Sequence, residues 1–117
     1  MTHYYYLASD QKMEIGYSLI DFVETSESIP GFDYPLQLEI INGVEKDYEL
    51  RELLNFIHNH TKRYEVCTVQ IANLLNAHNI ELKVQTKSKI LLHEIVDPKQ
   101  MLIKEGHLLT IKKVPVF

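Results

Sequence analysis

The apolar residues of this chain repeat at two different intervals, and the change between them limits the fold more than any other feature of the sequence. In the middle of the chain, one set follows the i, i+3, i+4, i+7 spacing of an amphipathic helix: Leu50, Leu53, Leu54 and Ile57. Before it, Leu36, Leu38 and Ile40 alternate with other residues, which is the period of a strand. Helical spacing between strand-like ends predicts an α+β fold.

The first helix is expected over about 47–60. Asp47 is placed to cap it, and acidic residues in the first turns favour a helix there. The dipeptide Asn42-Gly43 favours a hairpin instead, with a return strand over 44–48. The helical stripe is the stronger pattern, so we expect a short extended piece that leads into the helix.

A second amphipathic helix is expected after a short polar segment. Its stripe has the same spacing as the first: Cys67, Ile71, Leu74, Leu75 and His78. Thr68 is suited to the N-cap, and Asn79 to the left-handed position that ends a helix.

The remaining segments carry strand and turn patterns. Alternation or β-branched and aromatic residues predict strands at 3–8, 36–41, 82–86, 90–96 and 108–111. Residues 86–89 are expected to turn between two of them, Asp97-Pro98 to begin a short helical turn, and 26–35 to form a loop. Residues 15–23 fit strand and helix equally well. The prediction is a mixed or antiparallel sheet of about four to five strands packed against two amphipathic helices.

Length and composition indicate a single small domain over 1–117. The chain is 45% hydrophobic and 24% charged, as in globular proteins. Its one cysteine, Cys67, excludes an internal disulfide framework and suits a reducing compartment. Neither a signal peptide nor a membrane-spanning stretch is visible, so we expect a cytoplasmic protein without membrane contact. The Ile-, Lys-, Asn- and Glu-rich composition resembles small bacterial or phage proteins, which assigns no function.

The net charge of −4 conceals two halves of opposite sign. Residues 1–59 hold eleven acids and three bases, a charge of −8, whereas residues 60–117 hold five acids and nine bases, a charge of +4. If the halves form separate faces, the molecule is an electrostatic dipole capable of head-to-tail or two-fold self-association. If they interleave in the fold, the charges neutralise one another.

Histidines and the cysteine are the residues best suited to catalysis or metal binding. On a helix, His58 and His60 are about 200° apart and point to opposite faces. Cys67 lies on an apolar stripe, where a free cysteine usually packs as a small hydrophobe. The sequence lacks nucleophile-elbow, zinc-protease, phosphate-loop and dinucleotide motifs. We therefore expect neither cofactor nor metal, and the enzyme alternative is a site assembled from distant segments with His58, His60 or His93.

Nucleic-acid binding is a second alternative. Two helices followed by a hairpin is the order of a winged helix-turn-helix, and Lys83, Lys87 and Lys89 would lie on or beside the hairpin tip. Against this, the expected recognition helix over 69–78 has no Lys or Arg, and the isoelectric point is near 5.8. Lysines on a strand also discourage edge-to-edge pairing.

The favoured hypothesis is a non-catalytic protein-interaction or regulatory module. It rests on charge segregation, on seven tyrosines and on the lack of a catalytic motif. In a strand at 3–8, Tyr4 and Tyr6 face one way and Tyr5 the other. The candidate contact residues are three tyrosines, three lysines and the C-terminal aromatic residue: Tyr4, Tyr5, Tyr6, Lys83, Lys87, Lys89 and Phe117.

Overall fold

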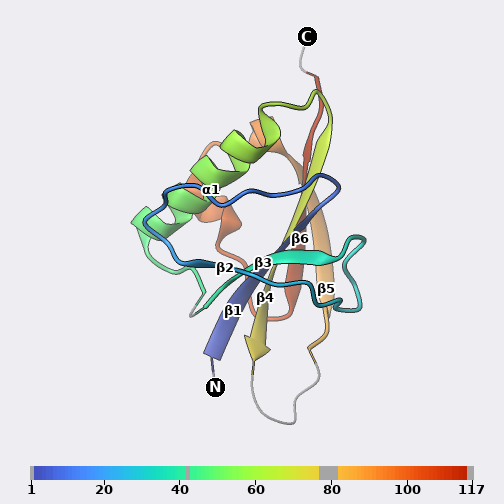
Figure 1. The fold of residues 1–117 in the computed structure, drawn as a ribbon. Coiled ribbons are helices and arrows are strands. Elements are labelled where there is room, and N and C mark those ends of the chain that lie inside the picture. The colour runs from blue at the N-terminus through green and yellow to red at the C-terminus, as the bar shows by residue number, and fades with distance from the viewer. Residues whose placement is uncertain (1, 42, 77–81, 116–117) are drawn as a thin grey trace.

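A six-stranded sheet with one long helix against it forms the molecule (Figure 1). The structure is a computed structural model and describes residues 2–41, 43–76 and 82–115. The elements in chain order are β1 (Thr2–Ser9), β2 (Phe22–Glu24), β3 (Leu36–Ile40), α1 (Asp47–Thr61), β4 (Cys67–Asn76), β5 (Thr86–Leu91), the short 3₁₀ turns η1 (Leu92–Glu94) and η2 (Pro98–Met101), and β6 (His107–Lys113).

The sheet is mixed, and its strands run in the order β2-β3-β1-β4-β6-β5. All neighbouring pairs are antiparallel except β5 and β6, which are parallel. The predicted α+β class is therefore confirmed, with a larger sheet and fewer helices than expected. No helix in the described ranges is long and apolar enough to span a membrane.

Helix α1 forms where the stripe predicted it. Leu50, Leu53 and Ile57 are buried against the sheet, which accounts for the spacing. Asp47 lies inside the first turn, and the N-cap position belongs to Lys46. No N-cap side chain accepts a hydrogen bond here, so the capping expected of Asp47 is wrong; instead the Glu49 carboxylate accepts a hydrogen bond from the Lys46 N–H at 2.9 Å.

The expected second helix is wrong, because residues 67–76 form strand β4. This strand lies in the middle of the sheet and pairs with β1 on one side and β6 on the other. Val69 and Ile71 are buried on the α1 side, whereas Ala72 and Leu74 are buried on the other. A strand covered on both faces is apolar almost throughout, and such a run fits helical spacing as well. Asn79 lies outside the described residues.

The expected hairpin over 82–96 is also wrong. The predicted turn at 86–89 falls inside β5, a single strand that pairs in parallel with β6. The chain leaves β5 through η1, so there is no return strand in 92–96. The helical turn expected after Asp97 is present as η2, where the Asp97 carboxylate accepts from the Lys99 N–H at 3.0 Å.

Each face of the sheet has its own apolar core. The core on one face lies under α1 and includes Tyr5, whereas the core on the other face includes Tyr6. No helix of the described residues covers that second face. It is covered by the loop that contains Ile29 and by the segment with Val84, which leads into β5. The two coverings meet at Gly31, whose φ of 109° and close approach to Val84 leave no room for a side chain.

Candidate functional site

Four exposed lysines lie along the β5 side of the sheet. Lys87 and Lys89 are two residues apart on β5, so they share a face, and the pairing of Leu91 with Lys112 brings a third lysine beside them. Lys83 lies in the segment that leads into β5. We call these the basic edge: Lys83, Lys87, Lys89 and Lys112. Residues 82–91 and 107–113 contain no acidic residue.

A groove of about 290 Å³ opens beside the basic edge. Lys89 and Lys112 line it together with two acids, Asp33 and Glu94. The Asp33 carboxylate accepts a hydrogen bond at 2.9 Å from the side chain of Gln70, which is only 1% exposed. The groove is therefore basic on the strand side and acidic on its rim.

Four exposed or half-buried acids lie along the opposite side of the sheet. We call these the acidic edge: Asp21, Glu24, Glu27 and Glu39. A hydrogen bond from the Leu36 N–H to the Glu27 carbonyl oxygen holds that loop beside β3. Partial burial, and then the charge of Glu27, raise the pKa of Glu39, so these two carboxylates repel each other. Residues 21–40 contain neither Lys nor Arg.

The two charged edges are the two ends of the strand order. Four strands separate β2 from β5, a span of roughly 24 Å at the usual strand spacing. The sequence left open whether the acidic and basic halves interleave. In the fold the two edges lie apart, but the halves are not fully separated: Asp33 lies across on the basic side, and Glu14 of the acidic half pairs with Arg63 of the basic half.

Exposed apolar side chains lie in β2 and in the segment of chain that leads into it. Tyr17 is 95% exposed, Leu19 is 60% exposed, and Val23 on β2 is 39% exposed. All three lie within seven residues of chain and flank Asp21. An aromatic anchor and aliphatic groups bordered by charge are the usual composition of a protein-binding surface.

The candidate tyrosines contribute mainly to the two cores. Tyr5 and Tyr6 are each 1% exposed. Tyr4 is half-buried, and its ring stacks on that of Tyr6 with 5.9 Å between the ring centroids. They alternate between faces as predicted. The Tyr5 hydroxyl donates to the Met101 carbonyl and accepts from the Ile103 N–H, both at 3.2 Å. Phe117 lies outside the described residues.

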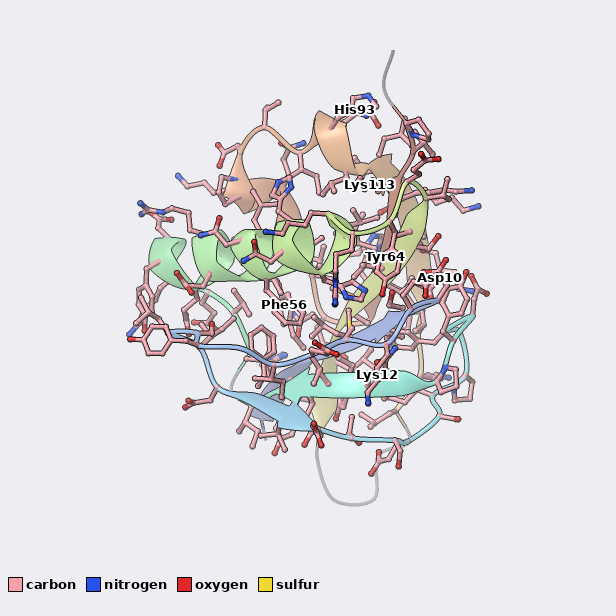
Figure 2. All side chains as sticks on the ribbon, turned by 45° about the horizontal axis from the view of Figure 1, so that its top comes forward. Asp10, Lys12, Phe56, Tyr64, His93 and Lys113 are labelled. Atoms are coloured by element: carbon pink, nitrogen blue, oxygen red, sulfur yellow. The ribbon has the colours of Figure 1, made fainter. Side chains whose placement is uncertain are left out.

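The candidate histidines do not come together. His60 is buried, whereas His58 is exposed on the other side of α1 and His93 is exposed on η1. Figure 2 shows His93 well away from Phe56 and Asp10. The winged-helix arrangement is absent as well, because the described part of its second helix is strand β4.

His60 belongs instead to a buried polar cluster that joins α1 to the ends of two strands. Its Nε2 lies 2.9 Å from Ser9 Oγ and 3.7 Å from Cys67 Sγ. Asp10 accepts from the Cys67 thiol at 3.5 Å and from the Thr68 N–H at 3.0 Å. Ser9 and Asp10 were not singled out in the sequence, because they are more than fifty residues from their partners.

The ionisation of this cluster suits a structural role. Burial raises the pKa of the Cys67 thiol to about 11, so the thiol is protonated at neutral pH and a poor nucleophile. Burial, and then the charge of Arg63, lower the pKa of His60 despite the opposing charge of Asp10. The predicted packing of Cys67 in the core is confirmed.

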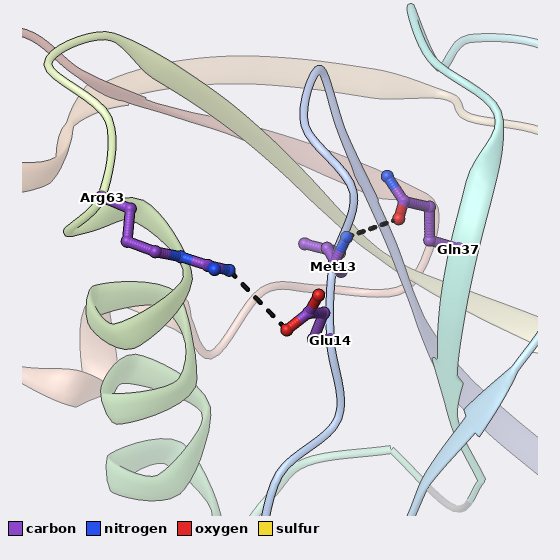
Figure 3. A network of polar contacts seen from close by, with 4 residues as sticks. All are labelled: Met13, Glu14, Gln37 and Arg63. Atoms are coloured by element: carbon purple, nitrogen blue, oxygen red, sulfur yellow. Dashed lines mark hydrogen bonds and ion pairs between the residues drawn. The ribbon is translucent and has the colours of Figure 1, made fainter.

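A strap runs alongside α1, between the helix and β3 (Figure 3). We give this name to residues 14–19, which run between the buried anchors Met13 and Ile20. Figure 3 shows two ties near its start, a Met13 N–H hydrogen bond to Gln37 at 2.7 Å and a Glu14–Arg63 ion pair at 3.8 Å. Between the strap and α1 is a cleft of about 410 Å³.

The comparisons with known proteins assign no family. Neither the protein-family models, nor the curated proteins, nor the solved structures include a match to this chain. Within the described ranges, no group of three or more His, Cys, Asp or Glu side chains is arranged to hold a metal ion. The candidate sites are therefore the two charged edges and the cleft.

Proposed function

We propose that this chain is a non-catalytic protein-interaction module that binds through the charged edges of its sheet. The observation that carries the proposal is the separation of charge: four lysines on the basic edge and four acids on the acidic edge, at opposite ends of the strand order. Opposed charged surfaces guide association and select partners of complementary charge.

The edges are also the places where the backbone is open to a partner. Among the described strands, none pairs with the outer side of β2 or β5. Lysines on an edge strand oppose pairing with an uncharged or basic strand, and they favour an acidic one. The exposed Val23 on β2 provides an apolar contact beside the acidic edge, which charges alone lack.

The partner that fits both edges is a second copy of this chain. The acidic edge of one molecule is opposite in sign to the basic edge of the next and equal to it in number of charges. Such a contact joins two different surfaces, so it is head-to-tail and extends beyond a dimer unless it closes into a ring. Because the charges are exposed, salt weakens it.

Sedimentation velocity at about 20 mM and about 500 mM salt tests this, since the Debye length falls roughly fivefold between them. We expect association at low salt and monomer at high salt. The double variant Lys87→Glu/Lys89→Glu is expected to be monomeric at both. A control with the same change in charge, Lys62→Glu/Lys99→Glu, alters exposed lysines at the end of α1 and in η2, outside the basic edge, and should behave as the wild type. If the wild type is monomeric at both salt concentrations, self-association is ruled out.

Nucleic-acid binding is the competing outcome of the same experiment. A polyanion could use the basic edge in place of an acidic protein surface. Retention on DNA or RNA at low salt that is lost in Lys87→Glu/Lys89→Glu, without self-association of the wild type, would replace the proposed partner by nucleic acid.

A further inference from the structure

Strand β5 has an open backbone edge, and two hydrogen bonds show which of its residues face outward. In a ladder, successive residues of a strand point their N–H and C=O groups to opposite sides. The Thr86 N–H donates toward β6, at 3.2 Å to the carbonyl oxygen just before that strand, so the backbone groups of Lys87 and Lys89 point outward. The Leu91 N–H follows the same alternation and donates outward to the Glu94 carboxylate at 2.9 Å. The open part of the edge is therefore Lys87 to Lys89.

In the described part of the chain, lysine side chains are the only protection of this edge. The register of β5 with β6 is continuous, and the strand contains neither a bulge nor a proline. The hydroxyls of Thr86 and Ser88 each lie 2.7 Å from a ring nitrogen of His107 on β6, which holds β5 extended. Lysines oppose the approach of an uncharged or basic strand, and they attract an acidic one.

Strand β2 has a matching open edge at the other end of the sheet. Directly after this strand, the Thr25 N–H donates to the Gln37 carbonyl oxygen at 3.0 Å, on the β3 side. By the same alternation, the backbone groups of Phe22 and Glu24 point away from β3. Each edge thus presents two residues, two positions apart, whose N–H and C=O groups face outward. The two sets match in spacing and carry side chains of opposite charge.

We infer that β2 of one molecule adds to β5 of the next as an antiparallel strand, so that the sheet continues from molecule to molecule. The inference rests on the proposed self-association and specifies how the two edges bind. With Glu24 opposite Lys87 and Phe22 opposite Lys89, each pair exchanges two backbone hydrogen bonds. The Glu24 carboxylate and the Lys87 ammonium group then lie directly across from each other on one face, where opposite charges attract. The backbone supplies the binding, and the charges select the strand.

Amide-resolved hydrogen exchange of the full chain tests the pairing. At about 20 mM salt, exchange is compared between dilute, monomeric protein and concentrated, associated protein, and the amides are read by NMR after dissociation at high salt. The N–H groups of Lys87, Lys89, Phe22 and Glu24 should exchange about tenfold more slowly once about nine in ten molecules are bound. The Thr86 N–H, which bonds within the molecule, should be protected equally in both samples.

Two variants with the same charge isolate the contribution of the backbone. Lys89→Pro and Lys89→Ala both remove the ammonium group, but only proline also removes the outward N–H. Because that N–H does not bond to β6, a proline at this position leaves the ladder intact. We expect Lys89→Pro to associate about tenfold more weakly than Lys89→Ala in sedimentation, the effect of about one hydrogen bond.

The outcomes separate strand addition from the proposed self-association. A wild type that is monomeric at low salt would overturn both. Association without slower exchange at Lys87 and Lys89, or equal association of the two Lys89 variants, would overturn strand addition but leave binding through the charged edges. Protection on β5 without protection at Phe22 and Glu24 would exclude β2 as the added strand. If Lys89→Pro does not fold, the exchange of the wild type decides alone.

Discussion

At the scale of single residues, Tyr5 shows why an aromatic side chain in this protein can stabilise the fold rather than bind a partner. Its ring belongs to the core under α1, and its hydroxyl bonds to Met101 and Ile103, nearly one hundred positions away. These two bonds fasten the segment after η2 to β1. Burial raises the pKa of Tyr5, so the hydroxyl keeps its proton and continues to donate.

We expect Tyr5→Phe to lower the free energy of unfolding by about 1–3 kcal/mol, because it leaves the Met101 carbonyl and the Ile103 N–H without their partner. Urea unfolding of the variant measures this. Tyr17→Phe removes the same atom from a side chain that is 95% exposed, and it should change stability by less than about 0.5 kcal/mol. Equal stability of the two variants would contradict the role given to the Tyr5 hydroxyl.

His60 predicts a pH dependence of stability. Its folded pKa lies below the usual 6.5, because burial and the charge of Arg63 outweigh the attraction of Asp10. Since the unfolded chain takes up the proton first, the contribution of His60 is complete above about pH 6.5 and is lost as the pH falls through the folded pKa.

The measurement is the free energy of unfolding between about pH 7.5 and about pH 5, which brackets the usual histidine pKa. The fall in stability should be smaller in His60→Gln than in the wild type, whereas His93→Gln, at an exposed position, should keep the wild-type profile. Parallel profiles for all three proteins would show that His60 is not the titrating group.

At the scale of elements, the two coverings of the second face depend on a glycine. Gly31→Ala places a Cβ 2.6 Å from that of Val84 at a φ that alanine rarely adopts, and we expect a loss of more than about 1 kcal/mol. Gly16→Ala meets open space and should be neutral or stabilising by up to about 1 kcal/mol. Thermal unfolding of both variants compares them directly. A similar melting temperature for both would contradict the close packing at Gly31.

The elements differ in how far sequence alone could predict them. Helix α1 has one buried and one exposed face, so its spacing has a single interpretation. Strand β4 is buried on both faces, and its apolar run does not distinguish strand from helix. The parallel pairing of β5 with β6 depends on the chain between them, which no local pattern records. The pairing of Ser9 with His60 is likewise a product of the fold.

At the scale of the whole molecule, strand order converts a charge asymmetry along the sequence into one across the sheet. The sequence shows that charge is divided, but only the order β2-β3-β1-β4-β6-β5 places the two signs at opposite ends. The strands between them are largely buried. The molecule therefore presents two unlike edges on one sheet, which is the arrangement that head-to-tail assembly requires.

The most direct test of this account mixes two variants that each lack one edge. Lys87→Glu/Lys89→Glu keeps the acidic edge, and Glu24→Lys/Glu27→Lys keeps the basic edge, so at low salt each alone should sediment as a monomer. Mixed in equal amounts, they should form a one-to-one complex that high salt dissociates. A mixture that remains monomeric, while the wild type associates, would contradict pairing between the two edges.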